Sequence, residues 1–228
     1  MKLLIDADVL CYAVAFTCSE EPVEVAERTM KGNVTDIIAA LYTGQDEYSW
    51  ELFLSGPSEE NFRNEIAVTA PYKGNRTGKE KPEHHQALRD YLVREWNATV
   101  SVGQEADDDI ATAATAIEDS VIVSIDKDFD QVPGDHYNPR KKEFYTVSEE
   151  EGLLWFYRQF LIGDAIDNIK GADGIGDVKS LELLEDKTEY QMWKTVVEIL
   201  GYDRAYENAL LLHLRRKPNE FWTEPEKD

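Results

Sequence analysis

The chain has few of the residues that cross-link small secreted domains or bind zinc. Only two cysteines, Cys11 and Cys18, and four histidines occur among its 228 residues. Neither cysteine has Cys or His partners at ligand spacing, so we expect buried thiols rather than a disulfide or a zinc site. His84 and His85 are adjacent, and adjacent side chains on a helix point about 100° apart, so they are poor candidates for one metal ion.

Long apolar segments are also lacking. No apolar run approaches the length needed to span a bilayer, and no leader of charged and then apolar residues precedes the first expected strand at 2–6. We therefore expect a cytoplasmic protein without membrane association. An apolar content of 42% is sufficient for a sizeable core, and 228 residues fit one α/β domain, either alone or with a small helical appendage.

Basic residues are scarce: 24 Lys and Arg stand against 46 Asp and Glu, which gives a net charge of −22. This balance argues against nonspecific binding of nucleic acid through bulk charge. The basic residues are nevertheless concentrated in one third of the chain, and a local basic stripe can steer a polyanion towards an acidic protein. The stripe consists of Arg63, Lys73, Arg76, Lys79, Lys81, Arg89 and Arg94.

Apolar runs alternate with amphipathic segments along the first two thirds of the chain. This alternation, with short connections, predicts a mostly parallel sheet flanked by helices, in which ligands bind at the carboxyl ends of the strands. Capping boxes, Ser148 with Glu151 and Thr188 with Gln191, predict helix starts. The expected strands are 2–6, 50–54, 98–102 and 120–125, with a hairpin at 136–147; the expected helices are 35–43, 83–96, 105–117, 148–162 and 202–216, and the chain after 148 is expected to be all helical.

Acidic residues recur at four places where a strand or turn precedes a helix. Carboxylates brought together repel one another, so gathering them requires a divalent cation, and oxygen ligands suit Mg²⁺ or Mn²⁺. A pair of such ions is a common means of cutting phosphodiesters. The alternative, ordinary solvated acids, is disfavoured because each group follows an apolar run. The groups are Asp6 and Asp8; Glu105, Asp107 and Asp108; Asp126 and Asp128; and Asp164 and Asp167, the last two expected on one helix face.

Two further segments suggest phosphate binding. Gly171, Gly174 and Gly176 allow backbone N–H groups to approach a phosphate at a helix N-terminus, although a plain interhelical turn is the alternative. The segment 70–82 is rich in Gly, Pro, Lys and Arg and is predicted to be a mobile loop. Within it, Lys73 and Arg76 are suited to neutralising a scissile phosphate, and Tyr72 to stacking on an unpaired base. A solvated basic loop is the alternative.

Five motifs in this order resemble the 5′-nuclease family: flap endonucleases, the 5′→3′ exonuclease domain of bacterial DNA polymerase I and bacteriophage 5′→3′ exonucleases. They are Ile-Asp at 5–6, Pro-Tyr-Lys-Gly-Asn-Arg at 71–76, Glu-Ala-Asp-Asp at 105–108, Asp-Lys-Asp-Phe-Asp-Gln at 126–131, and the segment 163–176. The last three together are highly specific. The compact length, without a polymerase domain, favours the phage-like or free-standing type.

The resemblance implies a PIN-like nuclease core over 1–162, with a helical arch at about 71–97. It further implies a helix–turn–helix-type module over 163–228 that grips duplex DNA and completes the active site, with K⁺ at the turn Gly174-Ile175-Gly176. One departure is that the family usually has an aspartate after the second strand, where this chain has Ser55-Gly56-Pro57. The missing carboxylate would weaken one metal site unless Asp8 replaces it.

The resemblance also implies roles for individual residues. Two divalent ions, Mg²⁺ or Mn²⁺, would be held by Asp6, Glu105, Asp107 and Asp126 at one site and by Asp108, Asp128, Asp164 and Asp167 at the other. Lys73 and Arg76 would be the catalytic cations. The DNA-binding residues would be Arg63, Tyr72, Lys73, Arg76, Gly171, Gly174, Ile175, Gly176 and Lys179.

The expected function is a metal-dependent 5′→3′ exonuclease and structure-specific flap endonuclease acting on DNA with 5′ ends, flaps or nicks. Its expected setting is phage replication or recombination in the host cytoplasm, as a monomer, and RNA–DNA hybrids are compatible substrates. Two alternatives stay open: a noncatalytic protein that binds branched DNA, motivated by Ser55-Gly56, and a ribonuclease of the related single-domain type, against which the glycine turn argues.

Overall fold

The backbone forms two compact units. The computed structural model describes residues 1–42, 44, 47–76 and 78–227. The first unit comprises 1–61, 79–129 and 134–146, and the second comprises 62–78, 130–133 and 147–228. The division into domains 1–162 and 163–228 expected from the sequence stays a prediction.

A mostly parallel sheet organises the first unit, as predicted. Among the described residues six strands are hydrogen-bonded in the order β3-β2-β1-β4-β5-β6. β1 pairs in parallel with both β2 and β4, β2 with β3, and β4 with β5. The strand order therefore reverses between β1 and β4, which is where sheets of this kind bind ligands. The strands are β1 (Lys2–Asp6), β2 (Ser49–Leu54), β3 (Thr99–Val100), β4 (Ser120–Val123), β5 (Gly134–Asn138) and β6 (Glu143–Val147).

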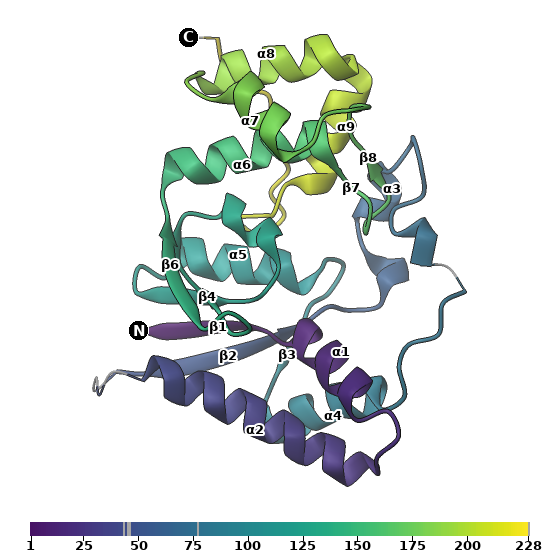
Figure 1. Ribbon diagram of the computed structural model, residues 1–228, viewed down its shortest axis with the longest axis vertical. Coiled ribbons are helices and arrows are strands. Elements are labelled where there is room, and N and C mark those ends of the chain that lie inside the picture. The colour runs from purple at the N-terminus through teal and green to yellow at the C-terminus, as the bar shows by residue number, and fades with distance from the viewer. Residues whose placement is uncertain (43, 45–46, 77, 228) are drawn as a thin grey trace. The chain divides into compact units, whose positions relative to one another are not determined.

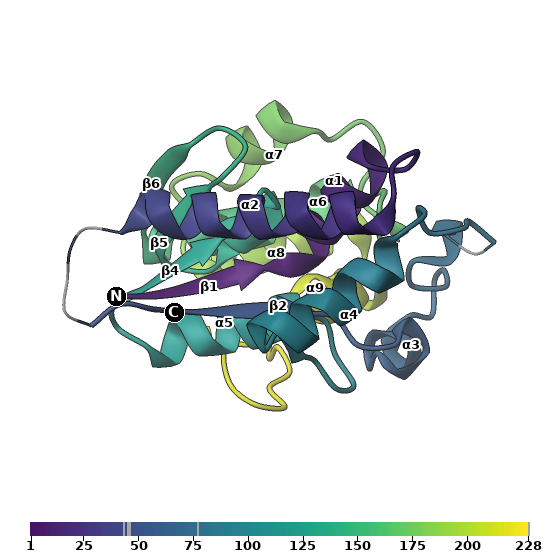
Figure 2. The same cartoon turned by 90° about the horizontal axis from the view of Figure 1, so that it is seen from below.

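Helices cover both faces of this sheet. On one face α1, α2 and α4 pack against one another, and α5 lies on the opposite face (Figure 1). Figure 2 shows α2 extending along the direction of the strands. Leu3 and Ile5 of β1 share a core with Val34 and Leu88, which closes the first of these layers. The helices are α1 (Ala7–Thr17), α2 (Val23–Leu41), α4 (His85–Trp96) and α5 (Ala106–Ala116).

The helix expected at 35–43 is the end of a longer helix, because α2 begins at Val23. An apolar stripe at three- and four-residue spacing is buried along it: Ala26, Met30, Val34, Ile37 and Leu41. The first part of this helix was not predicted from the sequence, because acidic residues and the mid-helix Gly32 lie among the apolar residues of the stripe. The expected last residue, Thr43, lies outside the described residues.

The second unit is a helical assembly around an aromatic core. The rings of Phe156 and Phe160 lie 4.7 Å apart, and those of Trp193 and Trp222 lie 4.9 Å apart. Both predicted capping boxes are confirmed, at the starts of α6 and α8. The elements are α3 (Arg63–Ile66), a 3₁₀ turn at Gly74–Arg76, α6 (Glu149–Ile162), β7 (Gly163–Asp164), β8 (Ile169–Lys170), α7 (Asp177–Leu184), α8 (Glu189–Leu200) and α9 (Tyr202–Leu212). Elsewhere in the chain, 3₁₀ turns lie at Ser58–Glu60 and Lys127–Gln131.

The prediction of an all-helical chain after 148 is wrong at 163–170, where β7 and β8 form an antiparallel hairpin. A Cβ built on Gly163 would lie 2.3 Å from the nitrogen of Gly171, so two glycines allow the chain to approach itself here. The expected shared helix face for Asp164 and Asp167 is also wrong, because one ends β7 and the other lies in the hairpin turn. A helix–turn–helix-type module after 163 is not confirmed.

Both cysteines are buried free thiols, in agreement with the sequence. Within the part of the chain that the structure describes, no helix combines the length and apolarity required to cross a membrane.

Replacing Gly56 by Ala tests how closely the strand ends approach one another. Its Cβ would lie 2.3 Å from the carbonyl oxygen of Ser101, so we expect Gly56→Ala to lower the free energy of unfolding by about 1–3 kcal/mol. The control is Gly32→Ala in α2, where a Cβ meets nothing within 4 Å and should raise it by about 0.5–1 kcal/mol. Urea denaturation measures both, and an unchanged midpoint for Gly56→Ala would contradict the contact.

Candidate active site

Asp6 and Asp126 lie at the point where the strand order of the first unit reverses. Asp6 is the last residue of β1, and Asp126 follows β4. The hydroxyl of Ser124 connects them: it donates to Asp6 Oδ2 at 2.8 Å and accepts the backbone N–H of Asp126 at 3.0 Å. Ser124 is absent from the site residues predicted from the sequence. In the sequence, the only indication of its role is its position between the end of a strand and an aspartate.

The pKa of Asp6 is raised to about 7, chiefly by burial and then by the neighbouring carboxylates of Asp8 and Asp126. The hydrogen bonds from Ser124 and from the N–H of Val9 act in the opposite direction and lower it. A buried carboxyl group beside other carboxylates is stabilised in its charged form by a nearby cation. The chemistry of this position therefore fits a divalent ion.

The acids of the third motif occupy the first turn of α5. Glu105 and Asp108 form a capping box, in which the N–H of Glu105 donates to Asp108 Oδ2 at 3.3 Å. Asp108 is fully buried, and Asp107 is half-buried. The N-terminus of a helix stabilises negative charge, so α5 supports all three acids. Asp126 likewise organises its neighbour, because its Oδ1 accepts the N–H of Asp128 at 2.9 Å.

Ser55 directly follows the end of β2, where the resemblance leads one to expect an aspartate. Its hydroxyl accepts the N–H of Ala106 at 3.0 Å, at the start of α5. Its own N–H donates to Asp8 Oδ2 at 2.7 Å, while Asp8 Oδ1 forms an ion pair with Arg89. Arg89 also donates to the carbonyl oxygen of Ser55. Asp8 therefore uses both of its oxygens to fix the end of β2 and to bind α4.

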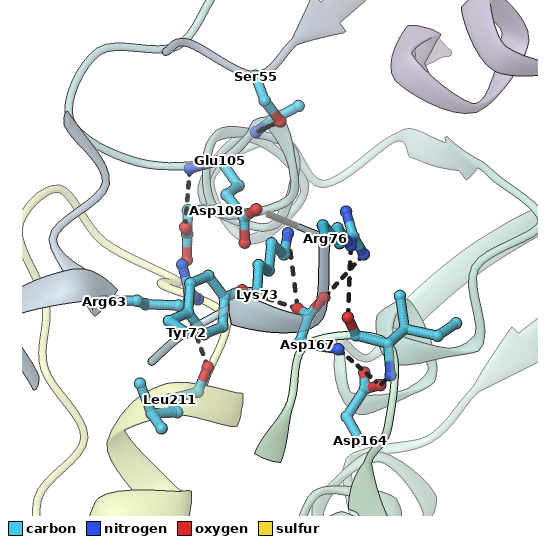
Figure 3. A network of polar contacts seen from close by, with 12 residues as sticks. Ser55, Arg63, Tyr72, Lys73, Arg76, Glu105, Asp108, Asp164, Asp167 and Leu211 are labelled. Carbon is cyan, nitrogen blue, oxygen red and sulfur yellow. Dashed lines mark hydrogen bonds and ion pairs between the residues drawn. The ribbon is translucent and has the colours of Figure 1, made fainter. Parts of the chain in front are cut away.

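In the second unit, three residues of the basic segment converge on Asp167 (Figure 3). The Tyr72 hydroxyl donates to Asp167 Oδ2 at 2.7 Å, and Arg76 Nη2 donates to Oδ1 at 2.9 Å. Lys73 Nζ lies 3.6 Å from Oδ2. Asp164 Oδ1 accepts the N–H groups of Ile166, at 2.6 Å, and of Asp167, at 3.2 Å. This arrangement brings two of the predicted acids and both predicted catalytic cations together.

Two predicted DNA-binding side chains have structural contacts instead. Arg63 is only 1% exposed, and its guanidinium donates to the carbonyl oxygens of Leu211 and His213 at 2.8 Å each, which caps the end of α9. Tyr72 is 9% exposed and belongs to the core of the second unit. Neither side chain lies on a surface open to DNA, which differs from the predicted role. A basic or aromatic residue in a loop gives no sequence signal of such burial.

The glycine motif leads into α7. Gly174 has a φ of +75°, and a Cβ on Gly174 or on Gly176 would meet nothing within 4 Å. Gly176 is the N-cap residue of α7, Ile175 packs against the aromatic core, and Lys179 is exposed on that helix. The backbone here is open to a ligand, and binding of DNA or K⁺ by this turn stays a prediction.

The predicted metal ligands are divided between the units. Over 1–42, 44, 47–76 and 78–227, no three His, Cys, Asp or Glu residues are arranged as a group that could hold a metal ion. Metal binding therefore stays a prediction, which the all-carboxylate donor set fits. The first unit contains Asp6, Glu105, Asp107, Asp108, Asp126 and Asp128, and the second contains Asp164 and Asp167.

Comparison with known proteins gives similarity in sequence over part of the chain. No family model matches it. It is 34% identical over 114 residues to the flap endonuclease Xni of Shewanella sediminis, covering 43% of this chain and 44% of that protein. The Xni of Shewanella piezotolerans is 31% identical over 145 residues, covering 57% and 56%. The chain thus matches about half the length of these curated relatives.

Comparison of structures gives similarity over most of the chain. The phage T5 5′-exonuclease with bound zinc ions aligns with a TM-score of 0.64 and 16% identity, over 93% of this chain and 89% of that one. A T5 D15 flap endonuclease in a complex with DNA and metal ions aligns with a TM-score of 0.52 and 15% identity, over 92% and 93%. The local sequence similarity is thus to flap endonucleases, and the fold is shared with the phage T5 5′-exonuclease structures.

Proposed function

We propose that this chain hydrolyses DNA phosphodiesters as a divalent-metal-dependent 5′→3′ exonuclease and structure-specific 5′-flap endonuclease. The observation that carries the proposal is the convergence of Lys73 and Arg76 on Asp167 within one unit. Positioned cations beside a potential metal ligand are what phosphoryl transfer requires. The names of the relatives, flap endonuclease and 5′-exonuclease, support the same reaction.

The metal sites would be formed by the carboxylates already described. Asp6, Glu105, Asp107 and Asp126 would hold one ion, and Asp108, Asp128, Asp164 and Asp167 would complete the sphere of a second. Mg²⁺ or Mn²⁺, when bound, polarises a phosphoryl oxygen as a Lewis acid. The chain's own contribution is to orient these acids, as Ser124 does for Asp6, and to neutralise charge on the phosphate through Lys73 and Arg76.

The substrate is proposed to be DNA with 5′ ends, flaps or nicks, with RNA–DNA hybrids as a further substrate. Residues 71–97 would form the arch, and a domain over 163–228 would grip the duplex, with K⁺ at the Gly174-Ile175-Gly176 turn. Lys179, exposed on α7, would contact a phosphate. The setting would be phage replication or recombination in the host cytoplasm, with the protein acting as a monomer.

A second candidate is a noncatalytic protein that binds branched DNA. Its basis is the end of β2, where a serine stands and where Asp8, the carboxylate best placed to compensate, is held by Ser55 and Arg89. It predicts tight binding without turnover. The single-domain ribonuclease is disfavoured by the glycine turn that follows Asp167, which proteins of that type lack.

Cleavage of a 5′-flap duplex labelled at each end tests the proposed function. We expect cutting near the flap junction in Mg²⁺ or Mn²⁺, and loss of at least about 100-fold in rate for Asp126→Asn, because the site would lose one ligand charge. Calorimetric titration of Mn²⁺ gives a second readout, which should be weaker for the variant. Intact substrate in both metals, with tight binding of the flap, would instead establish the noncatalytic candidate.

Replacing Lys73 by Ala separates catalysis from binding. Because the ammonium group would act on charge that develops in the transition state, we expect kcat to fall by about 10²–10³ while the Kd for flap DNA changes by less than about threefold. The matched control is Lys194→Ala, which removes an exposed lysine from α8 in the same unit. Equal losses in binding and in turnover would mean that Lys73 only anchors the DNA backbone.

A further inference from the structure

Two turns of the second unit are joined by hydrogen bonds that involve no carboxylate. We name residues 71–76 the cation turn and residues 164–168 the acid turn. Three successive carbonyl oxygens of the acid turn accept bonds from the cation turn. Asn75 Nδ2 donates to Ala165 at 2.6 Å, Arg76 Nε to Ile166 at 3.3 Å, and the N–H of Lys73 to Asp167 at 2.9 Å.

A fourth bond runs in the opposite direction. Asn168 Nδ2 donates to the carbonyl oxygen of Pro71 at 2.9 Å, and the same nitrogen lies 3.5 Å from the position that a Cβ on Gly74 would take. Each turn thus contributes one asparagine whose amide reaches the backbone of the other. Two amides from opposite sides fix both the separation and the register of the turns.

Both turns contain a non-glycine residue in the left-handed region. Lys73 has a φ of +52°, and Asn168 has a φ of +63°. Asparagine adopts this conformation readily, whereas lysine does so at a cost. The bond from the N–H of Lys73 to the acid turn holds the lysine there. The direction of its side chain therefore depends on how well the turns stay joined.

The ion pairs of Asp167 are a less dependable way to position the cations. The side chain of Arg76 is 44% exposed, so salt screens its pair with Asp167, and Lys73 Nζ lies 3.6 Å from Asp167 Oδ2, a longer separation than that of Arg76. A cation bound to Asp167 would, in addition, repel both side chains. The side-chain amides of Asn75 and Asn168 carry no net charge. Salt and a bound cation therefore weaken their hydrogen bonds less than they weaken the ion pairs of Asp167.

We propose that Asn75 and Asn168 are positioning residues, which hold the ammonium of Lys73 and the guanidinium of Arg76 in their reactive places when Asp167 is engaged by a cation. The expected effect on the cleavage rate rests on the proposed function. The expected loosening of the two turns rests on the hydrogen bonds alone. The two consequences are measured separately.

The test uses the full chain and three variants. Asn168→Gly keeps a residue that tolerates the positive φ and removes only the amide donor. Asn75→Ala removes the second donor from a 3₁₀ turn that accepts alanine. The matched control is Asn219→Gly, an exposed asparagine with a φ of +57° outside both turns.

The expected kinetic result is a fall of about 10- to 100-fold in the single-turnover rate on flap DNA for Asn168→Gly and Asn75→Ala, with a Kd within about twofold of the wild-type value. Asn219→Gly should cleave at the wild-type rate. Amide hydrogen exchange in 71–76 should be at least about tenfold faster in the two variants than in the control. Equal melting temperatures would separate this effect from general loss of stability.

Two outcomes would overturn the proposal: wild-type cleavage rates in both asparagine variants, or unchanged exchange in the cation turn. If the wild-type protein itself does not cleave, the proposed function fails, and unchanged exchange then still refutes the joined turns. A rate loss that follows the melting temperature would assign the asparagines to stability alone.

Discussion

Repulsion between carboxylates is the constraint on which the arrangement of this protein depends. Asp6 is buried at the carboxyl end of β1, and two further acids nearby raise its pKa. Such a position is stable only if donors face each acid. The fold supplies them from the hydroxyl of Ser124 and from the first turn of α1, where the N–H of Val9 points at Asp6.

The two units meet this constraint by different means. In the first, neutral donors serve most acids: backbone N–H groups serve Asp108 and Asp126, and a hydroxyl serves Asp6. In the second, Asp167 is served by a phenol and two cations. Neutral donors leave negative charge in place to attract a divalent ion, whereas cations beside an acid are available to an incoming phosphate.

Local chemistry made much of the fold predictable from the sequence. Runs of β-branched and apolar residues gave β1 and β4, and the Ser148 and Thr188 capping boxes gave the starts of α6 and α8, because each signal acts within a few residues. The hairpin at 163–170 was not predictable, since it depends on a close approach of Gly163 to Gly171. The burial of Arg63 was not predictable for the same reason. Its hydrogen-bond partners, at 211 and 213, are distant in the sequence, and no local pattern indicates them.

The serine at the end of β2 follows from the same balance of charge. A carboxylate at position 55 would stand beside Asp8, whose Oδ2 lies 2.7 Å from the nitrogen of that residue, and would add a further like charge near Asp6. With serine there, Asp8 is free to pair with Arg89, and a hydroxyl rather than an acid accepts the N–H of Ala106. Ser55 thus binds the starts of α1 and α5 without adding a charge, and Arg89 of α4 neutralises Asp8. This edge of the sheet therefore carries one negative charge fewer than an aspartate at position 55 would give it, while the donors that face Asp6 stay in place.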